Sequence, residues 1–517
     1  MLRPWQHVPC SDLDQQVFEA LVPAGHYLRR VKTILDFEAL RRILAASYPS
    51  STGRPAIEPV LLLKLEFLEY HYNLSDRQVI AAAQVNVAFR FFLDLSLHSG
   101  LPHHTLLTYF RERLGPEQHR RVFDAVVSQA REHGLVKDRL RLKDATHVIA
   151  NIAVPSTIQL VAQTRRQLLQ AARVYAAERV SREEHKAQEI HETTADLSDE
   201  ERLLQRVVHL RALVAWVDEL GETLPAGEDA ALAEALCLAH KVLNDRAASK
   251  PKGKTDKVVS VYDPDARSGK HGDWYQGYQL DVSMDADSAI ITALDVQPAN
   301  TDEAANAAKL IAHEEAVHGN DVQALSIDGV GYRGDVLREL TDPESLNLEV
   351  FVPSPQGRPP EQFAPELFTL NAEGTVLTCP AGQTTGPWKR NKLDTGTVYR
   401  FSRTTCAACP LREKCLEKPD QKQGRTVLKN DYEAEYRAAQ AKAKTEQYQH
   451  VRKEHPRIER KIADMVRWHG ARRARYRGRP SVCLQGLLTG IVVNIKRIVR
   501  LVGPPTIPVR AALAGRA

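Results

Sequence analysis

The sequence predicts an α/β protein in which a mixed sheet is flanked by helices, with an all-helical domain before the sheet and two insertions within it. Three observations predict this class: helix patterns fill the first ~138 residues, short apolar strand patterns begin at residue 139, and a charged stretch and a cysteine-rich stretch separate the strands. At 517 residues the chain is too long for one compact core, so two to four domains are expected.

The composition is that of an ordinary globular protein, with 43% hydrophobic and 26% charged residues. No apolar run approaches the roughly 18–20 residues that cross a bilayer, so we expect no membrane partner. The first residues lack the apolar core of a secretory signal, which predicts a cytoplasmic protein. An odd count of seven cysteines argues against a disulfide framework.

The first domain is expected to be helical. Residues 53–84 begin with a proline-marked helix start, and Ser75 with Gln78 three residues later forms a capping box for the next helix. Residues 101–115 predict a further short helix.

Strand 140–154 comes next and carries a lone carboxylate, Asp144, among apolar residues. The charged stretch 157–250 then predicts a helical insertion. In it, Ser198 and Glu201 form a capping box before apolar residues at helical spacing.

Beyond residue 257 strands alternate with helices. The expected elements are an antiparallel hairpin (278–285 and 289–298), a helix opened by Asn300 with Glu303, a strand carrying Asp328 (322–329), a helix (332–340), a strand (348–355) and a helix (431–470). Antiparallel strands, then a helix, then further strands is the order of a ribonuclease H-like core, although the pattern alone does not prove that topology.

These elements predict seven segments. They are a helical domain (1–138), the first core strand (139–156), a helical insertion (157–250), the middle part of the core (251–365), a cysteine-bearing insertion (366–430), the rest of the core with a basic segment (431–502) and a flexible tail (503–517).

Three acidic residues far apart in the sequence are candidates for one metal site. Asp144 lies in its apolar strand, Asp328 ends another strand with Gly329 and Gly331 after it, and Glu459 adjoins the apolar face of a helix. A glycine-rich exit lets the backbone turn and leaves the carboxylate facing open space. If the fold brings the three carboxylates together, they repel one another unless divalent cations lie between them. Two such ions activate an attacking oxygen and stabilise the leaving oxygen in phosphoryl displacement.

A competing interpretation is simpler. An isolated Asp at a strand end is usually a turn former or a helix cap, and we expect Asp263 and Asp265 to be turn residues of this kind. The spacing of Asp144, Asp328 and Glu459 alone leaves both interpretations open.

Four cysteines in the pattern C-x26-C-x2-C-x5-C predict a structural zinc site without a catalytic role: Cys379, Cys406, Cys409 and Cys415. The turns around them suit a tetrahedral Zn²⁺. The alternative is that they are reduced cysteines buried as small hydrophobic residues, and a fourth ligand from elsewhere also stays open.

A basic segment is expected to bind DNA. Between residues 452 and 479 eleven Arg or Lys residues face three acidic residues, so this stretch is more positive than the whole chain, whose net charge is +5. Arginine binds phosphate in a bidentate way, and interleaved aromatic rings stack on unpaired bases. The predicted DNA-binding residues are Arg467, Trp468, Arg472, Arg473, Arg475, Tyr476, Arg477 and Arg479. A solvated charged face is the usual alternative.

At these residues the chain resembles DDE transposases of bacterial insertion sequences. The resemblance spans about 55–510 and is nearest to the insertion-sequence family numbered eleven eighty-two, which also has an N-terminal helical domain and a cysteine-bearing insert. The blocks that carry it are 53–95, 142–154, 263–303, 326–335 and 458–497. The resemblance implies that Asp144 and Asp328 are the two catalytic aspartates and that Glu459 is the catalytic glutamate.

The surroundings of the glutamate depart from the family pattern, in which Tyr, Arg and Lys stand at set spacings. His455 stands four residues before Glu459, where an Arg is common, and Arg467 stands where a Lys is expected. Tyr448 and Arg452 are off-register substitutes.

The leading hypothesis is a transposase that uses two Mg²⁺ (or Mn²⁺) ions to cut DNA at the ends of its element and to join the freed 3′-OH to target DNA. The N-terminal helices would then bind the terminal inverted repeats, and pairing of two ends favours a dimer or a larger assembly. The alternatives are a catalytically inactive DNA-binding protein derived from a transposase and a metal-dependent nuclease without strand transfer.

Overall fold

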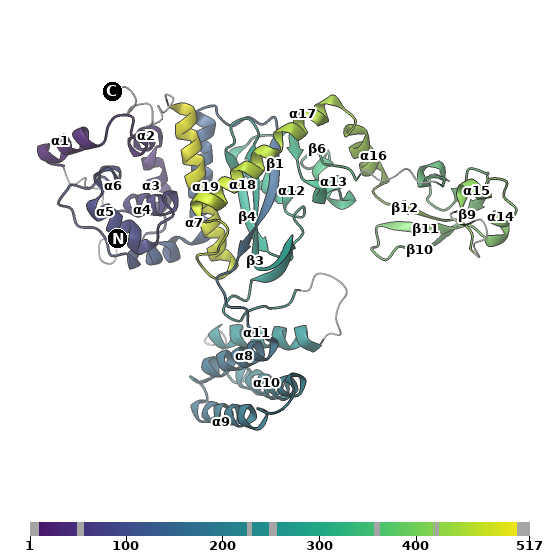
Figure 1. Ribbon diagram of the computed structural model, residues 1–517, viewed down its shortest axis with the longest axis horizontal. Coiled ribbons are helices and arrows are strands. Elements are labelled where there is room, and N and C mark those ends of the chain that lie inside the picture. Colours follow the sequence, from purple (N-terminus) through teal and green to yellow (C-terminus); the bar gives the residue numbers. More distant parts are fainter. Residues whose placement is uncertain are drawn as a thin grey trace, which may run out of the picture. The chain divides into compact units, whose positions relative to one another are not determined.

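The computed structural model describes residues 10–48, 56–224, 230–247, 256–355, 362–416, 418 and 423–503 (Figure 1). The chain divides into two compact units, each with hydrophobic clusters of its own. The first unit comprises Met1–Lys137, Asp144–Asp302 and Ile458–Ala517, and the second comprises Asp138–Lys143 and Glu303–Arg457. Apart from Gly503, the predicted tail 503–517 lies outside the described residues.

The first unit begins with helices, as predicted. They are α1 (Asp12–Leu21), α2 (Tyr27–Ile34), α3 (Phe37–Ala45), α4 (Pro59–His71), α5 (Asp76–Val85), α6 (Val87–Phe92) and α7 (Thr105–Glu132). The capping box of Ser75 and Gln78 is present at the start of α5. Helix α4 is buried all round, its charged residues Lys64, Glu66 and Glu69 included, because other helices, α3, α5 and α7 among them, pack around it. Helix α7 is much longer than expected and is broken at Gly115, where φ is +62°.

Helix α19 (Arg479–Val502) is a core helix of the first unit and packs against α4, α7 and strand β4 (Ile291–Pro298). A Cβ at Gly490 would lie 2.6 Å from Leu294 and 2.9 Å from Phe123, so glycine permits this close packing. By length and hydropathy alone α19 could cross a membrane, but 89% of its most apolar stretch is buried inside the protein.

Strands β2 (Arg267–His271) and β3 (Asp273–Asp285) form an antiparallel meander with β4 (Figure 1). The β3–β4 hairpin was predicted, whereas β2 was not. Gly277 in β3 has a φ of +154°, and a Cβ there would lie 2.1 Å from the backbone oxygen of Val148. Glycine therefore lets β3 approach β1 (Arg141–Ile149).

The predicted helical insertion is a bundle in the first unit. Its helices are α8 (Thr157–Ala172), α9 (Ala177–Thr193), α10 (Asp199–Glu222) and α11 (Ala230–Ala247). Ser198 and Glu201 form the predicted capping box of α10. Leucines, valines and Trp216 on their facing sides make a separate hydrophobic cluster.

The second unit contains strands β5 (Ala324–Ser326) and β6 (Glu349–Phe351), which are parallel, and the start of β1, which pairs in parallel with β5. The sheet is therefore mixed, with the order β2-β3-β1-β5-β6 and β4 on β3. Helices of this unit are α12 (Ala307–His318), α13 (Gly334–Thr341), α16 (Glu433–Lys442) and α17 (Glu446–Glu454). Buried side chains of α12, α13 and these strands form their common core.

A small cysteine-bearing module interrupts the second unit. It has two three-stranded sheets and two short helices: β7 (Thr369–Leu370), β8 (Leu377–Thr378), β9 (Thr384–Thr385), β10 (Pro387–Arg390), β11 (Gly396–Arg400), α14 (Arg403–Ala407), α15 (Arg412–Cys415) and β12 (Thr426–Asn430). Its core consists of Phe368, Leu377, Tyr399, Phe401 and Val427.

Two helix predictions were wrong. Helix α12 begins at Ala307, after Asn306, rather than near Asn300. The single helix predicted over 431–470 is three helices, α16, α17 and α18 (Pro456–His469), because Thr445 caps α17 and Pro456 starts α18. Helix α18 ends at His469, close to the predicted end, and Gly470, with a φ of +69°, follows it.

Candidate active site and nucleic-acid interface

Asp144 lies within β1 in the first unit and is half-buried. Its Oδ1 atom accepts a hydrogen bond from the backbone of Ala145 at 2.8 Å. The two basic residues that precede Asp144 in β1, Arg141 and Lys143, form their contacts within the second unit. Arg141 forms a fully buried ion pair with Glu314 at 2.6 Å, and Lys143 donates to the backbone oxygen of Glu303.

Asp328 lies in the second unit, two residues after β5, and is exposed. Its carboxylate forms no hydrogen bond or ion pair with any residue that the structure describes, and it does not cap the 3₁₀ turn Gly329–Gly331. A Cβ at Gly331 would lie 2.7 Å from the Ile327 side chain, so this tight turn requires glycine. The glycine turn after β5 therefore has the predicted form, and the Asp328 side chain is exposed.

Two residues of α17 and the turn after it hold the strand end that leads to Asp328. Arg452 donates hydrogen bonds to Ser326 Oγ at 3.1 Å and to the backbone oxygen of Ile327 at 3.0 Å. The buried His455 places Nδ1 3.1 Å from the same Ser326 Oγ. Burial and the nearby Arg452 lower the pKa of His455 to about 4, against the opposing effect of Asp328, so the ring is neutral at pH 7. We call Arg452, His455 and Ser326 the strand clamp.

Glu459 lies in the first turn of α18 in the first unit, where its side chain is exposed. Ile458, Ile462 and Met465 form the buried face of this helix, as predicted. Within the described residues, the Glu459 carboxylate makes no hydrogen bond or ion pair. Like Asp328, it is an exposed carboxylate that is not paired with a cation in the part of the chain that the structure describes.

The three predicted acids thus belong to different units, Asp144 and Glu459 to the first and Asp328 to the second. No group of three or more His, Cys, Asp or Glu side chains is arranged as metal ligands among the residues that the structure describes. Carboxylate oxygens are nevertheless the donors that Mg²⁺ and Mn²⁺ prefer, so the chemistry of the three residues fits such ions.

The basic segment divides into two groups. Arg467 and Trp468 lie on α18 and Arg473, Arg477 and Arg479 lie on the following loop and at the start of α19; all five are exposed. Arg472 is half-buried and donates to Thr146 Oγ1 and to the His147 backbone oxygen.

Arg475 and Tyr476 hold the fold together. Arg475 donates to Glu69 Oε1 at 2.7 Å and to the Leu74 backbone oxygen at 2.8 Å. Tyr476 lies 3.1 Å from Tyr70 across their hydroxyl groups, and Arg111 stacks over its ring. These contacts give both residues a structural role, and their predicted binding to DNA stays a prediction. Glu69 is the neutralising acid that the local charge count missed, because it lies in α4, 406 residues away.

Asp263 and Asp265 do more than form a turn. Asp263 is fully buried and accepts hydrogen bonds from the Tyr278 hydroxyl and from the backbone of Gly478 at 3.0 Å. Asp265 accepts from the backbone of Arg479 at 2.9 Å. These two acids therefore anchor the start of α19. Their neighbouring prolines and glycines gave no signal for this tertiary role.

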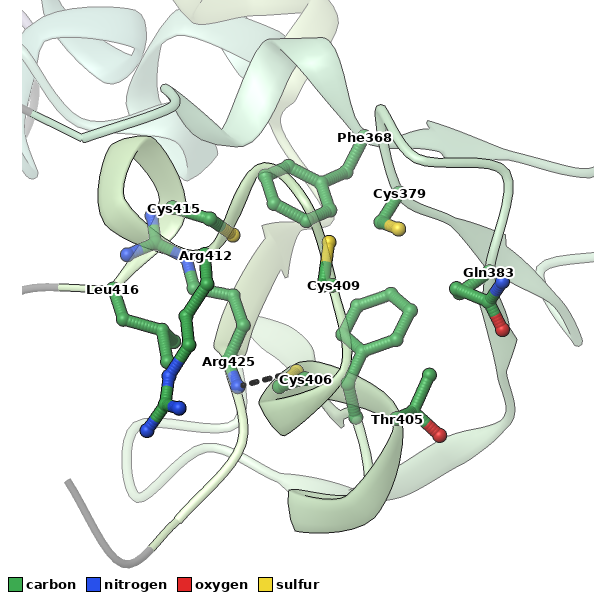
Figure 2. A pocket seen from close by; sticks show the side chains of 11 residues that line it. Phe368, Cys379, Gln383, Thr405, Cys406, Cys409, Arg412, Cys415, Leu416 and Arg425 are labelled. Carbon is green, nitrogen blue, oxygen red and sulfur yellow. Dashed lines mark hydrogen bonds between the residues drawn. The ribbon is translucent and has the colours of Figure 1, made fainter. Parts of the chain in front are cut away.

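All four predicted cysteines line one pocket of the cysteine-bearing module (Figure 2). Cys379 follows β8, Cys406 lies on α14, Cys409 follows that helix and Cys415 ends α15. The backbone N–H of Arg425 donates to Cys406 Sγ at 3.4 Å, a contact that suits a metal-bound thiolate. The cavity of about 20 Å³ has room for one ion-sized guest.

The four thiols also interact electrostatically. Burial raises the pKa of Cys415, Arg425 lowers it, and Cys406, Cys379 and Cys409 raise it. Without a cation, Cys415 therefore favours the protonated form. The donor set fits Zn²⁺, although the side chains are not placed as a finished set of ligands.

Comparison with known families supplies the context for these residues. A transposase domain (DUF772) matches residues 16–113, and a transposase DDE domain matches residues 378–499. No solved structure matches the chain. The second match includes Glu459 and the four cysteines, whereas Asp144 and Asp328 lie outside both matches.

A DDE domain implies a ribonuclease H-like core, with which the mixed α/β sheet of this chain agrees. The helical N-terminal region coincides with the other transposase domain. Both matched domains are transposase domains, and together they support a DDE transposase of the insertion-sequence type.

Proposed function

We propose that this transposase cuts DNA at the ends of its own element and joins the freed ends to target DNA, with Asp144, Asp328 and Glu459 as the catalytic acids. The observation that carries the proposal is that Asp328 and Glu459 are both exposed and lack a hydrogen bond or ion pair within the described residues. An exposed acid that stabilises nothing in the fold is available for an ion.

Two Mg²⁺ or Mn²⁺ ions would be held by the three carboxylates. When bound, such ions polarise the attacking oxygen and stabilise the leaving one. The protein's part is to orient the carboxylates, and the strand clamp serves this end for Asp328 through the backbone of β5. In the cut, a water oxygen bonds to phosphorus and the 3′ oxygen leaves as a 3′-OH. In joining, the oxygen of that 3′-OH bonds to a phosphorus of the target, and the 3′ oxygen of the target strand leaves and takes up a proton.

DNA contacts in this proposal use the exposed residues of the basic segment. These are Arg467, Trp468, Arg473, Arg477 and Arg479, with Arg472 beside them. Arg475 and Tyr476 belong to the proposed DNA-binding residues as well, and their contacts also fix the shape of the segment. The N-terminal helices would bind the terminal inverted repeats, and two copies of the chain would pair two element ends in the bacterial cytoplasm.

We also propose that Cys379, Cys406, Cys409 and Cys415 bind one structural Zn²⁺. Four cysteines on one cavity wall, with an N–H donor to one sulfur, support this assignment. The seven segments predicted from the sequence remain the proposed domain organisation.

The test incubates element-end DNA with the full-length protein and Mg²⁺ and maps the cut positions. Asp144→Asn, Asp328→Asn and Glu459→Gln should each lower cleavage by at least about 10³-fold, because each removes metal-binding charge. DNA binding should persist in all three variants. Cleavage that survives in one variant would show that its residue was wrongly assigned.

Two further outcomes separate the alternatives. A wild-type protein that binds element ends but never cuts them is an inactive derivative. One that cuts but does not join pre-cleaved ends to a target plasmid is a nuclease.

A further inference from the structure

The segment that carries Asp328 is held on both of its sides within the second unit. The strand clamp holds the side before Asp328, at the end of β5. The side after Asp328 consists of the 3₁₀ turn Gly329–Gly331 and the residues that lead to Gly334, where α13 begins. We call residues 328–334 the Asp328 turn. The contacts of this second side determine how the exposed Asp328 carboxylate is placed.

Tyr436 of α16 binds the end of the Asp328 turn. Its hydroxyl oxygen accepts a hydrogen bond from the backbone N–H of Gly334 at 2.9 Å. Gly334 is the first residue of α13, and the side chain of Arg333 before it does not cap this helix. The first N–H groups of a helix have no partner within the helix. The Tyr436 hydroxyl therefore takes the place of a capping side chain and ties the start of α13 to α16.

The same helix also holds the middle of the Asp328 turn. The rings of Tyr436 and Tyr332 have centroids 5.0 Å apart. Gln440, one helical turn after Tyr436, donates a hydrogen bond to the Tyr332 hydroxyl at 3.1 Å. Both tyrosines pack against the hydrophobic core that α12, α13, β5 and β6 share. Two points of the turn, Tyr332 and Gly334, are therefore fixed to α16.

Helices α13 and α16 approach each other closely at this point. A Cβ at Gly334 would lie 2.1 Å from the Cβ of Tyr432, so only glycine permits the approach. The guanidinium of Arg338 on α13 lies 4.4 Å from the centre of the Tyr432 ring and donates to the backbone oxygen of Asp431 at 2.7 Å. A sideways shift of the Asp328 turn would break these contacts.

The start of α16 is in turn fixed to the cysteine-bearing module. The backbone N–H of Asp431 donates to the backbone oxygen of Thr395 at 3.0 Å. The Asp431 carboxylate forms an ion pair with Arg390 of β10 at 2.5 Å. The position of α16, and with it that of Tyr436, therefore depends on contacts with the module as well as with α13.

We propose that Tyr436 is a positioning residue for DNA cleavage, which holds the Asp328 turn through Gly334 and Tyr332 so that the Asp328 carboxylate stays in place for a metal ion. This inference rests on the proposed function, which gives Asp328 its role. Groups behind a metal ligand set its orientation although they do not touch the ion. Tyr436 acts in this way and contacts neither the ion nor the DNA.

The first experiment measures hydrogen–deuterium exchange at the Gly334 amide in the full-length protein, without divalent cations. Tyr436→Phe removes the hydroxyl that accepts this N–H and keeps the ring. Exchange at Gly334 should become about 3- to 10-fold faster, as expected for the loss of one hydrogen bond. Tyr175→Phe, the same change at an exposed residue of the helical insertion, should leave this exchange unchanged. Thermal unfolding of both variants should stay close to that of the wild type.

The second experiment measures cleavage of element-end DNA over a series of Mg²⁺ concentrations. At limiting Mg²⁺, Tyr436→Phe should cut about 10-fold more slowly, because a displaced carboxylate binds the ion more weakly. Higher Mg²⁺ should restore most of the rate, because the charge of Asp328 remains. A variant that is merely less stable would lose the same fraction of the rate at every Mg²⁺ concentration. The affinity for DNA should equal that of the wild type.

Either of two results would overturn the inference and leave the proposed function intact. One is unchanged exchange at Gly334 in Tyr436→Phe. The other is faster exchange at Gly334 together with a cleavage rate that equals the wild-type rate at every Mg²⁺ concentration. A different result separates the proposed function from this inference: if Asp328→Asn cuts as fast as the wild type, the catalytic role of Asp328 is refuted, whatever the exchange at Gly334.

Discussion

Arginines that are close in sequence have different roles in this protein. Arg475 is mostly buried against Glu69, which is 2% exposed, and its guanidinium stacks over Tyr70. Arg473, two residues earlier, is exposed. Burying a guanidinium costs free energy unless an anion compensates it, so Arg475 depends on Glu69 whereas Arg473 remains available for a ligand.

Replacing Arg475 should therefore destabilise the protein. Arg475→Ala leaves Glu69 with Arg111 as its remaining close cation and should lower the free energy of unfolding by about 2–3 kcal/mol. Arg473→Ala should change it by less than about 0.5 kcal/mol but weaken DNA binding. Urea unfolding measures both variants. Equal stability of the two would contradict the structural role of Arg475.

His71 gives the protein a dependence on pH. Its ring stacks between Tyr27 and Phe67, with centroids 4.8 and 5.4 Å away. Burial, with contributions from Lys496 and His469, lowers the pKa of His71 to about 3. The ordinary pKa near 6.5 applies in the unfolded chain.

As the pH falls below 6.5, His71 binds a proton in the unfolded chain but not in the folded protein, so the free energy of unfolding declines toward pH 3. His71 alone should lower the free energy of unfolding by about 1–2 kcal/mol between pH 7 and pH 5. His71→Phe, which keeps the stack, should remove that part of the decline in urea unfolding. His450→Phe, at a side chain that is 77% exposed, is the control. A decline that is the same in both variants would refute the role of His71.

At the scale of elements, short strands depend on the helices beside them. Strand β5 has three residues, and its backbone hydrogen bonds with neighbouring strands are too few to fix the position of Asp328 and the turn after it. The strand clamp supplies side-chain hydrogen bonds from α17 to Ser326 and Ile327. Sequence comparison pointed to Arg452 and His455 only as imperfect members of a pattern around Glu459, but both contact the strand of Asp328.

The strand clamp should affect turnover more than DNA affinity. Arg452→Ala should lower the cleavage rate by about 10- to 100-fold, because the Asp328 carboxylate would be displaced and would no longer hold the metal ion in the position that catalysis needs. Arg452→Lys, which can restore one of the two hydrogen bonds, should recover part of that rate. Cleavage kinetics at saturating DNA test this. Loss of DNA binding with an unchanged rate at saturation would assign Arg452 to DNA instead.

At the scale of the whole molecule, the hydrophobic cores of the chain differ in size. The first unit buries the long apolar helix α19, whereas the cysteine-bearing module has a core of five buried residues. So small a core is marginal without a further link, and a metal bound to four thiolates would supply that link.

Metal analysis should therefore find about one zinc per chain after purification without chelator. Removing it with a strong chelator should raise protease sensitivity within residues 363–430 before the rest of the chain is cut. Cys406→Ser should behave like the chelated protein, and Cys237→Ser, at an exposed cysteine of the helical insertion, should not. Full protection in the chelated protein would rule out a structural zinc.

Local sequence determined most of the elements of this protein. Capping boxes at Ser75 and Ser198, alternation in the β3–β4 hairpin and the glycines after Asp328 act within a few residues, so they were predictable from the chain alone. The missed breaks at Thr445 and Pro456 carried local signals as well, since both are residues that begin helices.

Only the tertiary structure decided which polar and charged groups contact one another. Arg475 meets Glu69 across 406 residues, Gly478 meets Asp263 across 215, and Arg452 meets Ser326 across 126. Electrostatic interaction depends on distance in space and on burial, and neither can be read from neighbours in the chain. For this reason the sequence predicted the kinds of residues at the site, while the fold separated the cations that stabilise it from those left for DNA.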